Sequence, residues 1–224
     1  MSALPPRRGI RSPEPAAPTV DLIVLAGGRA SRLGGAVKPA VEVAGRTLLS
    51  RVLDARGLAR RVVVVGPDTA RAAAGRHDAR WALEDPPFGG PVAGIAAGLA
   101  ALADTPADWL LILACDLPWA ADAARLLLDA RPDLPPHGDG AYLEDADGHA
   151  QWLTGLYRRE SLVAAMNRLG PDAHGASMRQ LLGTLTLTSI RDDAGVARDV
   201  DTWEDVLTST TRLTGAAESA RSPE

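Results

Sequence analysis

The sequence predicts an α/β fold in which a doubly wound, mostly parallel sheet carries helices on both faces. Short runs of β-branched residues and leucines, such as residues 22–25, are apolar on both faces, which is typical of central strands in a parallel sheet. These runs alternate with segments of helix length, the pattern of repeated strand–helix units. At 224 residues, 46% of them hydrophobic, the chain is long enough to bury the core of one such domain.

Each expected element follows from a local pattern. Strands are expected where apolar runs of strand length occur, at residues 22–25, 61–65, 80–83, 109–114, 139–144, 151–157 and 185–190, with a hairpin turn at Asp147-Gly148. Helices are expected at residues 48–58, 68–74, 121–130, 160–169 and 177–182, together with one that begins near Pro91 and a last one after Asp201. Thr47 is expected to cap the first helix, and Pro91 suits a first helical turn because its missing N–H loses no partner there.

The two terminal segments differ in composition from the rest of the chain. Residues 1–19 are rich in Pro, Arg and Ala and show no hydrophobic period, so we expect a disordered leader. Residues 211–224 are expected to form a second disordered tail. The functional domain is therefore expected to span residues 20–210.

Composition argues against several classes of function. The net charge is −4, so no general basic surface points to nucleic acid. Cys115 is the only cysteine, which excludes an internal disulfide and a cysteine-based metal cluster, and the four histidines show no metal-ligand spacing. No apolar stretch has membrane-spanning length or the form of a signal peptide. We therefore expect a cytoplasmic protein that binds no membrane, and a monomeric state is compatible with the sequence.

The stretch from Val20 to Lys38, VDLIVLAGGRASRLGGAVK, joins a buried strand to a glycine-rich loop. Gly27 and Gly28 allow the backbone to lie close to a ligand. The N–H groups of the loop, together with Arg32 and Lys38, are typical of a phosphate-binding site. The glycine spacing fits neither the Walker loop nor the G-x-G-x-x-G fingerprint of dinucleotide-binding proteins. The loop therefore predicts phosphate binding of another kind.

Lys38 is the only lysine among the 24 lysine and arginine residues of the chain. An ammonium group is a compact point donor, whereas a guanidinium group is a planar fork, so a tight phosphate site can require lysine. The survival of one lysine inside the glycine-rich segment favours a functional role for it.

Acidic residues follow two other expected strands. Glu84 and Asp85 come directly after residues 80–83, and Asp116 comes after residues 109–114. In doubly wound sheets, ligands bind beyond the carboxyl ends of the strands, at the point where the strand order reverses. We therefore expect these carboxylates and the glycine-rich loop to meet at one edge of the sheet.

The pattern L-A-G-G-x-x-x-R-L-G-x-x-x-K, which runs from Leu25 to Lys38, resembles the signature loop of the nucleotidyltransferases related to molybdenum cofactor guanylyltransferase. The resemblance covers residue 22 to about residue 207 and implies a Rossmann-like nucleotidyltransferase fold. Further matching pieces are Glu84-Asp85, GGPVAGI, Cys115-Asp116-Leu117-Pro118 and Asp199-Val200-Asp201-Thr202. The chain departs from the family pattern at Val37, Val65 and Trp203, where members often carry Asp, Asn and Pro.

The resemblance also implies the roles of individual residues. The nucleotide-binding residues are expected to be Leu25, Ala26, Gly27, Gly28, Lys38, Asp85 and Asp116. Mg²⁺ is expected on Asp116 and Asp201, and the catalytic residues are expected to be Lys38, Arg32 and Asp116. The implied reaction is the Mg²⁺-dependent transfer of GMP from GTP to molybdopterin, the pterin of the molybdenum cofactor, with release of pyrophosphate.

Several alternatives remain open from the sequence. Within the same class, the chain could be a cytidylyltransferase for the same pterin or a transferase that acts on a sugar phosphate or a phospholactate. From another class, it could be a non-catalytic nucleotide-binding domain, against which Lys38 and Asp116 argue. An enzyme that transfers hydride with a dinucleotide cofactor is disfavoured by the glycine spacing.

Overall fold

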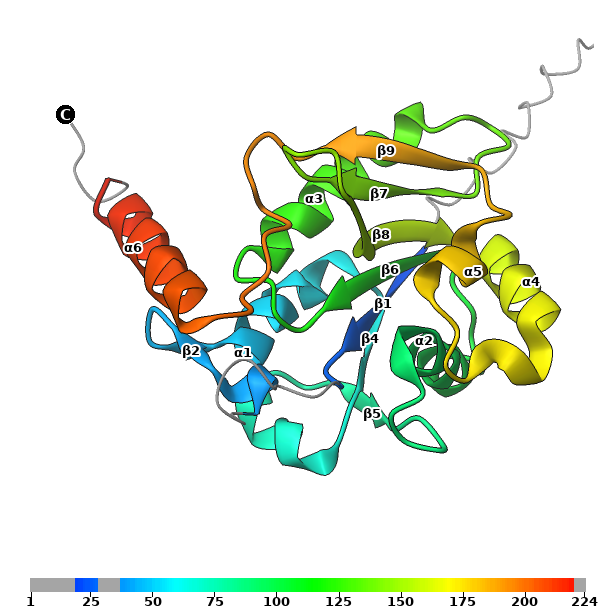
Figure 1. Cartoon of the computed structure of the whole chain (residues 1–224), viewed down its shortest axis with the longest axis horizontal. Coiled ribbons are helices and arrows are strands. Elements are labelled where there is room, and N and C mark those ends of the chain that lie inside the picture. Colours follow the sequence, from blue (N-terminus) through cyan, green and yellow to red (C-terminus); the bar gives the residue numbers. More distant parts are fainter. Residues whose placement is uncertain (1–18, 28–36, 220–224) are drawn as a thin grey trace, which may run out of the picture.

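A computed structural model of the protein describes residues 19–27 and 37–219. Seven strands form one main sheet in the order β5-β4-β1-β6-β8-β7-β9 (Figure 1). These strands are β1 (Val20–Leu25), β4 (Arg61–Val65), β5 (Arg80–Ala82), β6 (Trp109–Ala114), β7 (Gly140–Glu144), β8 (Ala150–Arg158) and β9 (Leu187–Arg191). A small second sheet pairs β2 (Glu42–Val43) with β3 (Arg46–Thr47).

The helices lie where the sequence predicted them, with some boundaries shifted. They are α1 (Leu48–Val52), α2 (Gly90–Ala101), α3 (Ala120–Ala130), α4 (Arg159–Leu169), α5 (Met178–Leu182) and α6 (Trp203–Ser219). Short 3₁₀ helices occur at η1 (Lys38–Ala40), η2 (Leu53–Leu58), η3 (Asp68–Ala74), η4 (Arg131–Asp133) and η5 (Gly170–Ala173). The predicted cap is present, because the Thr47 side chain accepts a hydrogen bond from the N–H of Ser50. None of the described helices combines the length and the apolar composition needed to cross a membrane.

The sheet is mostly parallel, as predicted. β1 pairs in parallel with β4 and β6, and β5 joins β4 in the same direction. β8 is antiparallel to both of its neighbours, while β7 and β9 are parallel to each other. The predicted hairpin is the β7–β8 pair. The fold class is therefore confirmed.

The alternation of side chains along β1 builds two separate cores. Leu22 and Val24 point into a cluster with residues of α1, η2 and α3. Ile23 and Leu25 point to the opposite face, into a cluster with residues of α2, α4 and α5. These three helices lie on one side of the sheet, and α1 and α3 lie on the other (Figure 1). Because both faces are covered by helices, every residue of β1 is buried, which explains its unbroken apolar run.

The strand order reverses beside β1. From β1 the chain adds β4 and then β5 outward on one side, and α2 returns it to β6 on the other side of β1. Two glycines let α2 approach the sheet closely, since a Cβ on Gly98 would lie 2.8 Å from Cγ2 of Ile23 and one on Gly94 3.1 Å from Cδ2 of Leu25. The carboxyl ends of β1 and β6 therefore border the same opening at the edge of the sheet.

The prediction for the C-terminal tail needs correction. α6 continues to Ser219, so residues 211–219 are helical rather than part of a disordered tail. Contacts with distant segments account for this, because the guanidinium of Arg212 lies 4.3 Å from the ring of Trp119 and donates to the carbonyl of Ala194. Leu213 also packs against the core. The expected leader, apart from residue 19, and residues 220–224 lie outside the described residues.

A buried charge cluster lies at the opposite edge of the sheet, where β1 and β4 begin. Asp21 is fully buried, and its Oδ2 lies 2.7 Å from Nη2 of Arg61 and 3.3 Å from Nη2 of Arg60. Arg61 also reaches the half-exposed Asp104, at 2.5 Å. A carboxylate without access to water requires such partners, since an unpaired buried charge is costly.

Replacing Asp21 by Asn should lower the free energy of unfolding by about 3–5 kcal/mol, because the largely buried Arg61 loses its buried counter-charge. Urea denaturation monitored by circular dichroism measures the loss. Asp104→Asn is the matched control, since it removes a solvated partner of the same arginine, and its effect should be much smaller. Equal effects of the two substitutions would contradict this view of the cluster.

Candidate functional site

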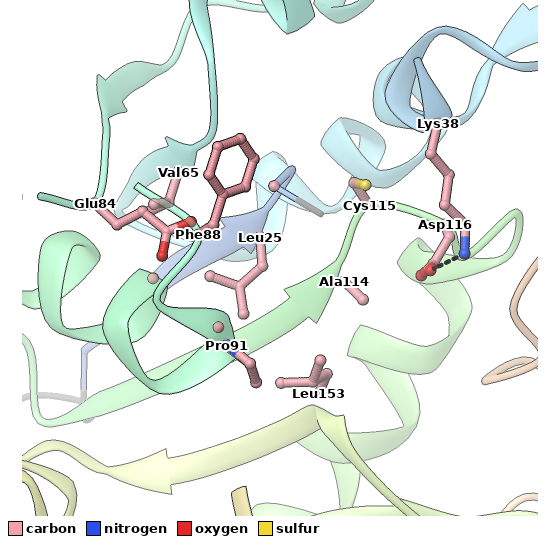
Figure 2. A pocket seen from close by; sticks show the side chains of 13 residues that line it. Leu25, Lys38, Val65, Glu84, Phe88, Pro91, Ala114, Cys115, Asp116 and Leu153 are labelled. Atoms are coloured by element: carbon pink, nitrogen blue, oxygen red, sulfur yellow. Dashed lines mark ion pairs between the residues drawn. The ribbon is translucent and has the colours of Figure 1, made fainter. Parts of the chain in front are cut away.

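A cavity of about 570 Å³ opens at the carboxyl ends of the central strands (Figure 2). Its size falls within the range of small-molecule sites. The lining residues come from the ends of β1, β4 and β6, from η1, from the segment before α2, from α2 itself and from β8. They are Leu25, Gly27, Lys38, Val65, Glu84, Phe88, Gly90, Pro91, Gly94, Ala114, Cys115, Asp116 and Leu153. The cavity thus lies at the edge of the sheet where the sequence predicted convergence.

The two ends of the cavity differ in chemistry. Lys38 and Asp116 lie together at one end, whereas Glu84, Val65 and Phe88 lie at the other (Figure 2). Leu25, Ala114, Pro91 and Leu153 line the space between them. The cavity can therefore hold an elongated ligand that is charged at one end and has an apolar face and a hydrogen-bonding edge at the other.

Lys38 bridges two carboxylates from distant parts of the chain. Its Nζ lies 2.8 Å from Oδ2 of Asp116 and 2.5 Å from Oδ1 of Asp201. Burial of the ammonium lowers its pKa, but attraction to Asp116 and the hydrogen bonds to Asp116 and Asp201 outweigh burial, so the pKa of Lys38 is raised. The ammonium group remains fully charged at neutral pH.

A third carboxylate completes the charged end. Oxygen atoms of Asp116, Asp199 and Asp201 lie within 4.8 Å of one another. The N–H of Val200 donates to the backbone carbonyl of Asp116 at 3.0 Å, which ties this segment to the loop after β6. Val200 is fully buried, and Asp205 accepts hydrogen bonds from the N–H groups of Asp201 and Thr202 at the start of α6. Backbone contacts therefore hold the acids in place.

The carboxylate group fits a divalent cation. Oδ1 of Asp116 is buried and has no hydrogen-bond partner among the described residues. Three carboxylates face one ammonium, so negative charge is in excess in this part of the described structure. Mg²⁺ prefers oxygen ligands and is commonly held by one or two carboxylates with several waters. Asp116 and Asp201 were predicted for this role, and Asp199 is an addition.

Asp199 shows the electrostatic cost of this arrangement. Asp199 is exposed, yet its pKa is raised, first because the protein around it removes part of the water near the carboxylate and second because Asp116 and Asp201 repel its charge. The sequence analysis placed Asp199 in a segment that matches the family but predicted no metal role for it, although a local signal exists. Asp199 and Asp201 flank Val200, and two acids separated by one apolar residue would lie on the same side of an extended segment.

The two acidic residues after β5, Glu84 and Asp85, lie in different surroundings. Glu84 lines the cavity, and its Oε2 accepts a hydrogen bond from the N–H of Gly89 at 2.9 Å. Asp85 is exposed and is not among the lining residues. The strand β5 ends at Ala82, one residue earlier than predicted, which leaves Leu83 exposed and Glu84 turned to the cavity. The nucleotide contact assigned to Asp85 stays a prediction.

The remaining predicted residues fall into two groups. Leu25 and Gly27 line the cavity, while Ala26 is buried behind it and donates its N–H to the carbonyl of Val65 at 2.7 Å. Gly28 and Arg32 lie outside the described residues, and their phosphate-binding and catalytic roles stay predictions.

Another acidic group includes one of the histidines. Asp145, Asp147 and His149 lie close together in the β7–β8 turn. Oδ1 of Asp145 accepts the N–H groups of Asp147 at 3.0 Å and of His149 at 2.8 Å, so this side chain stabilises the turn.

The family model of the MobA-like NTP transferase domain matches residues 22–189. The chain belongs to this family. The resemblance indicated by the glycine-rich loop is thereby confirmed, and the match includes β1 from Leu22 onward, Lys38, Asp116 and the other strands that border the cavity.

Known relatives of this MobA-like domain agree with the assignment. Molybdenum cofactor guanylyltransferase from Rhodopseudomonas palustris (strain BisB5) is 41% identical over 127 residues, which cover 52% of this chain and 57% of the relative. The matched segments span between about half and two thirds of the length of the curated relatives.

Solved structures share the fold. Molybdopterin-guanine dinucleotide biosynthesis protein A from Archaeoglobus fulgidus has a TM-score of 0.67 at 19% identity, covering 87% of this chain and 99% of that chain. Rv0371c from Mycobacterium tuberculosis H37Rv, in complex with manganese, has a TM-score of 0.60 at 20% identity, covering 86% and 98%. At these identities the likeness concerns the fold alone.

Replacing Asp199 by Asn should stabilise the metal-free protein and weaken metal binding. A carboxyl whose pKa is raised by folding destabilises the folded state as pH rises through that pKa, so removing the charge raises the unfolding temperature at neutral pH. Removing a ligand should weaken Mn²⁺ binding about tenfold or more. Thermal unfolding with a chelator and calorimetric Mn²⁺ titration measure the two effects.

Asp193→Asn serves as the control for this substitution, because Asp193 is exposed and pairs with Arg191 outside the cluster. It should change neither quantity appreciably. If Asp199→Asn left Mn²⁺ affinity unchanged, Asp199 would not be a ligand.

Proposed function

We propose that this protein transfers GMP from GTP to molybdopterin in a Mg²⁺-dependent reaction that releases pyrophosphate. The observation that carries the proposal is the difference between the two ends of the cavity. One end holds Lys38 and the carboxylate cluster, and the other combines apolar side chains with the carboxylate of Glu84. Membership of the MobA-like NTP transferase family supports nucleotidyl transfer, and the name of the curated relative supports this donor and acceptor.

The reaction joins two phosphates. A phosphate oxygen of molybdopterin forms a bond to the α-phosphorus of GTP, and the bond from that phosphorus to the bridging oxygen breaks, so pyrophosphate leaves with the electron pair. Such a reaction depends on positioning and positive charge more than on a protein nucleophile. When bound, Mg²⁺ on Asp116, Asp199 and Asp201 would supply a Lewis acid for the phosphate oxygens.

The residues of the chain contribute charge and orientation. Lys38 presents a permanently charged ammonium beside the carboxylates, at the end of the cavity assigned to the phosphates. Gly27, at the carboxyl end of β1, has no side chain between the loop backbone and the ligand. Arg32 and Gly28 complete the predicted phosphate contacts.

The opposite end of the cavity is assigned to the base. Guanine offers N1–H and N2–H₂ donors on one edge, and Glu84 is the carboxylate that lines this end. Cytosine offers an N4–H₂ donor beside acceptors, so the same carboxylate would face unpaired acceptors. Such mismatches cost about 1–3 kcal/mol in a desolvated site, which corresponds to a tenfold to hundredfold preference for GTP.

A pyrophosphate-release assay with each nucleoside triphosphate, with and without molybdopterin, tests the proposal. We expect release with GTP only when molybdopterin and Mg²⁺ are both present. Lys38→Arg should lower the rate by about two to three powers of ten, because a planar guanidinium cannot reproduce a point contact. Arg125→Lys, a charge-conserving change on the exposed face of α3, should retain the rate. Release with CTP alone would replace the guanylyl assignment by a cytidylyl one.

Glu84→Gln should reduce the preference for GTP over CTP about tenfold or more, because the amide presents N–H₂ where the carboxylate accepts. The amide oxygen can still accept the N–H of Gly89, so the loop should keep its conformation. Calorimetric titration with GTP and CTP in Mg²⁺ measures the ratio. Asp85→Asn is the matched control from the neighbouring exposed position, and a larger effect there would restore the assignment to Asp85.

A further inference from the structure

Phe88 has an unfavourable conformation for its residue type. Its φ is +66°, and among the described residues the only other non-glycine residue with positive φ is Ala44. A bulky side chain is rarely found in this left-handed region. In addition, 67% of the residue is exposed, so burial of the ring offsets little of this cost. Strained residues at ligand sites are often held in place for function, and Phe88 lines the cavity.

The residue that follows Phe88 is firmly anchored. The N–H of Gly89 donates to Oε2 of Glu84 at 2.9 Å, and its carbonyl accepts from the N–H of Gly175 at 2.8 Å. A Cβ on Gly89 would lie only 2.5 Å from Cδ2 of His174, so the backbone of Gly89 packs directly against the side chain of His174. Gly89 is therefore fixed through both its N–H and its carbonyl, which constrains the backbone next to Phe88.

The ring lies at the end of the cavity that we assign to the base. Figure 2 shows Phe88 beside Glu84 and Val65, away from Lys38 and Asp116. The ring therefore offers a flat apolar surface next to the carboxylate that can accept hydrogen bonds from an edge of the base. Aromatic side chains stack on nucleobases with little regard to base identity, because every base has a π-face.

We propose that Phe88 stacks on the base of the bound nucleotide and is a positioning residue that supplies affinity, while Glu84 reads the edge. This inference rests on the proposed function, since it requires a nucleotide in this cavity. The roles of Phe88 and Glu84 can be separated by experiment. Loss of the ring weakens binding of any nucleoside triphosphate, whereas loss of the Glu84 charge changes the ratio of the affinities for GTP and CTP. The backbone strain at Phe88 is then a stability cost that serves ligand binding.

Calorimetric titration of the full chain in Mg²⁺ tests the proposal, with GTP and inorganic tripolyphosphate as probes. Phe88→Gly should weaken GTP binding about tenfold or more and leave tripolyphosphate binding within about twofold of wild type. Glycine adopts positive φ without penalty, so the unfolding temperature should equal or exceed that of wild type. A purely structural role for Phe88 would instead lower stability and weaken both probes.

Two further variants sharpen the test. Phe88→Tyr keeps an aromatic face and should bind GTP within about threefold of wild type. Leu83→Ala removes another exposed apolar side chain of the same segment that does not line the cavity, and should bind GTP as wild type does. Wild-type affinity for GTP in Phe88→Gly, or an equal loss of both probes, would overturn the stacking role alone. Failure of wild type to bind GTP would overturn the proposed function.

Discussion

The charged end of the cavity depends on one constraint: carboxylates that converge from separate segments need a cation among them. Lys38 supplies it, because its ammonium contacts Asp116 after β6 and Asp201 before α6. The same contacts connect the end of the glycine-rich segment with the central sheet and with the last helix. Asp199 adds a third negative charge, so the described cluster remains short of positive charge even with the lysine in place. This excess makes the site suitable for a metal ion, whose positive charge would in turn attract phosphates.

The position of this cluster follows from the topology of the sheet. The strand order reverses beside β1, because β4 and β5 are added on one side of β1 and β6 on the other. The cavity opens at the carboxyl ends of these strands. Small residues of α2, such as Gly94 and Gly98, bring that helix close to β1 and leave room for a cavity at its N-terminal end. The two ends of the cavity differ because Asp116 follows β6, whereas β4 ends in the apolar Val65.

Stability is given up at several points of the site. Asp199 carries a charge that its neighbours repel, and Phe88 holds a left-handed backbone with an exposed ring. Elsewhere the structure compensates: the central strands of the sheet are covered on both faces, and the fully buried Asp21 has arginine partners at the opposite edge. Strain and unbalanced charge thus gather at the end of the sheet where a ligand can relieve them.

The sequence by itself determined the central strands, because runs such as Arg61–Val65 and Trp109–Ala114 are apolar on both faces and can be buried only in the middle of a covered sheet. It also determined that Gly27-Gly28 and Asp116 directly follow such strands, and hence that the glycine-rich segment and this acid meet at one edge. Only the tertiary structure decided that Glu84 rather than Asp85 lines the cavity, that Asp199 joins the acids, and that α6 continues to Ser219. The physical reason is the sequence distance between the residues that interact. Burial patterns are local and periodic, so they can be read from neighbouring residues. The direction of a side chain at a strand end depends on residues distant in the chain, and so does a contact such as that of Arg212 with Trp119.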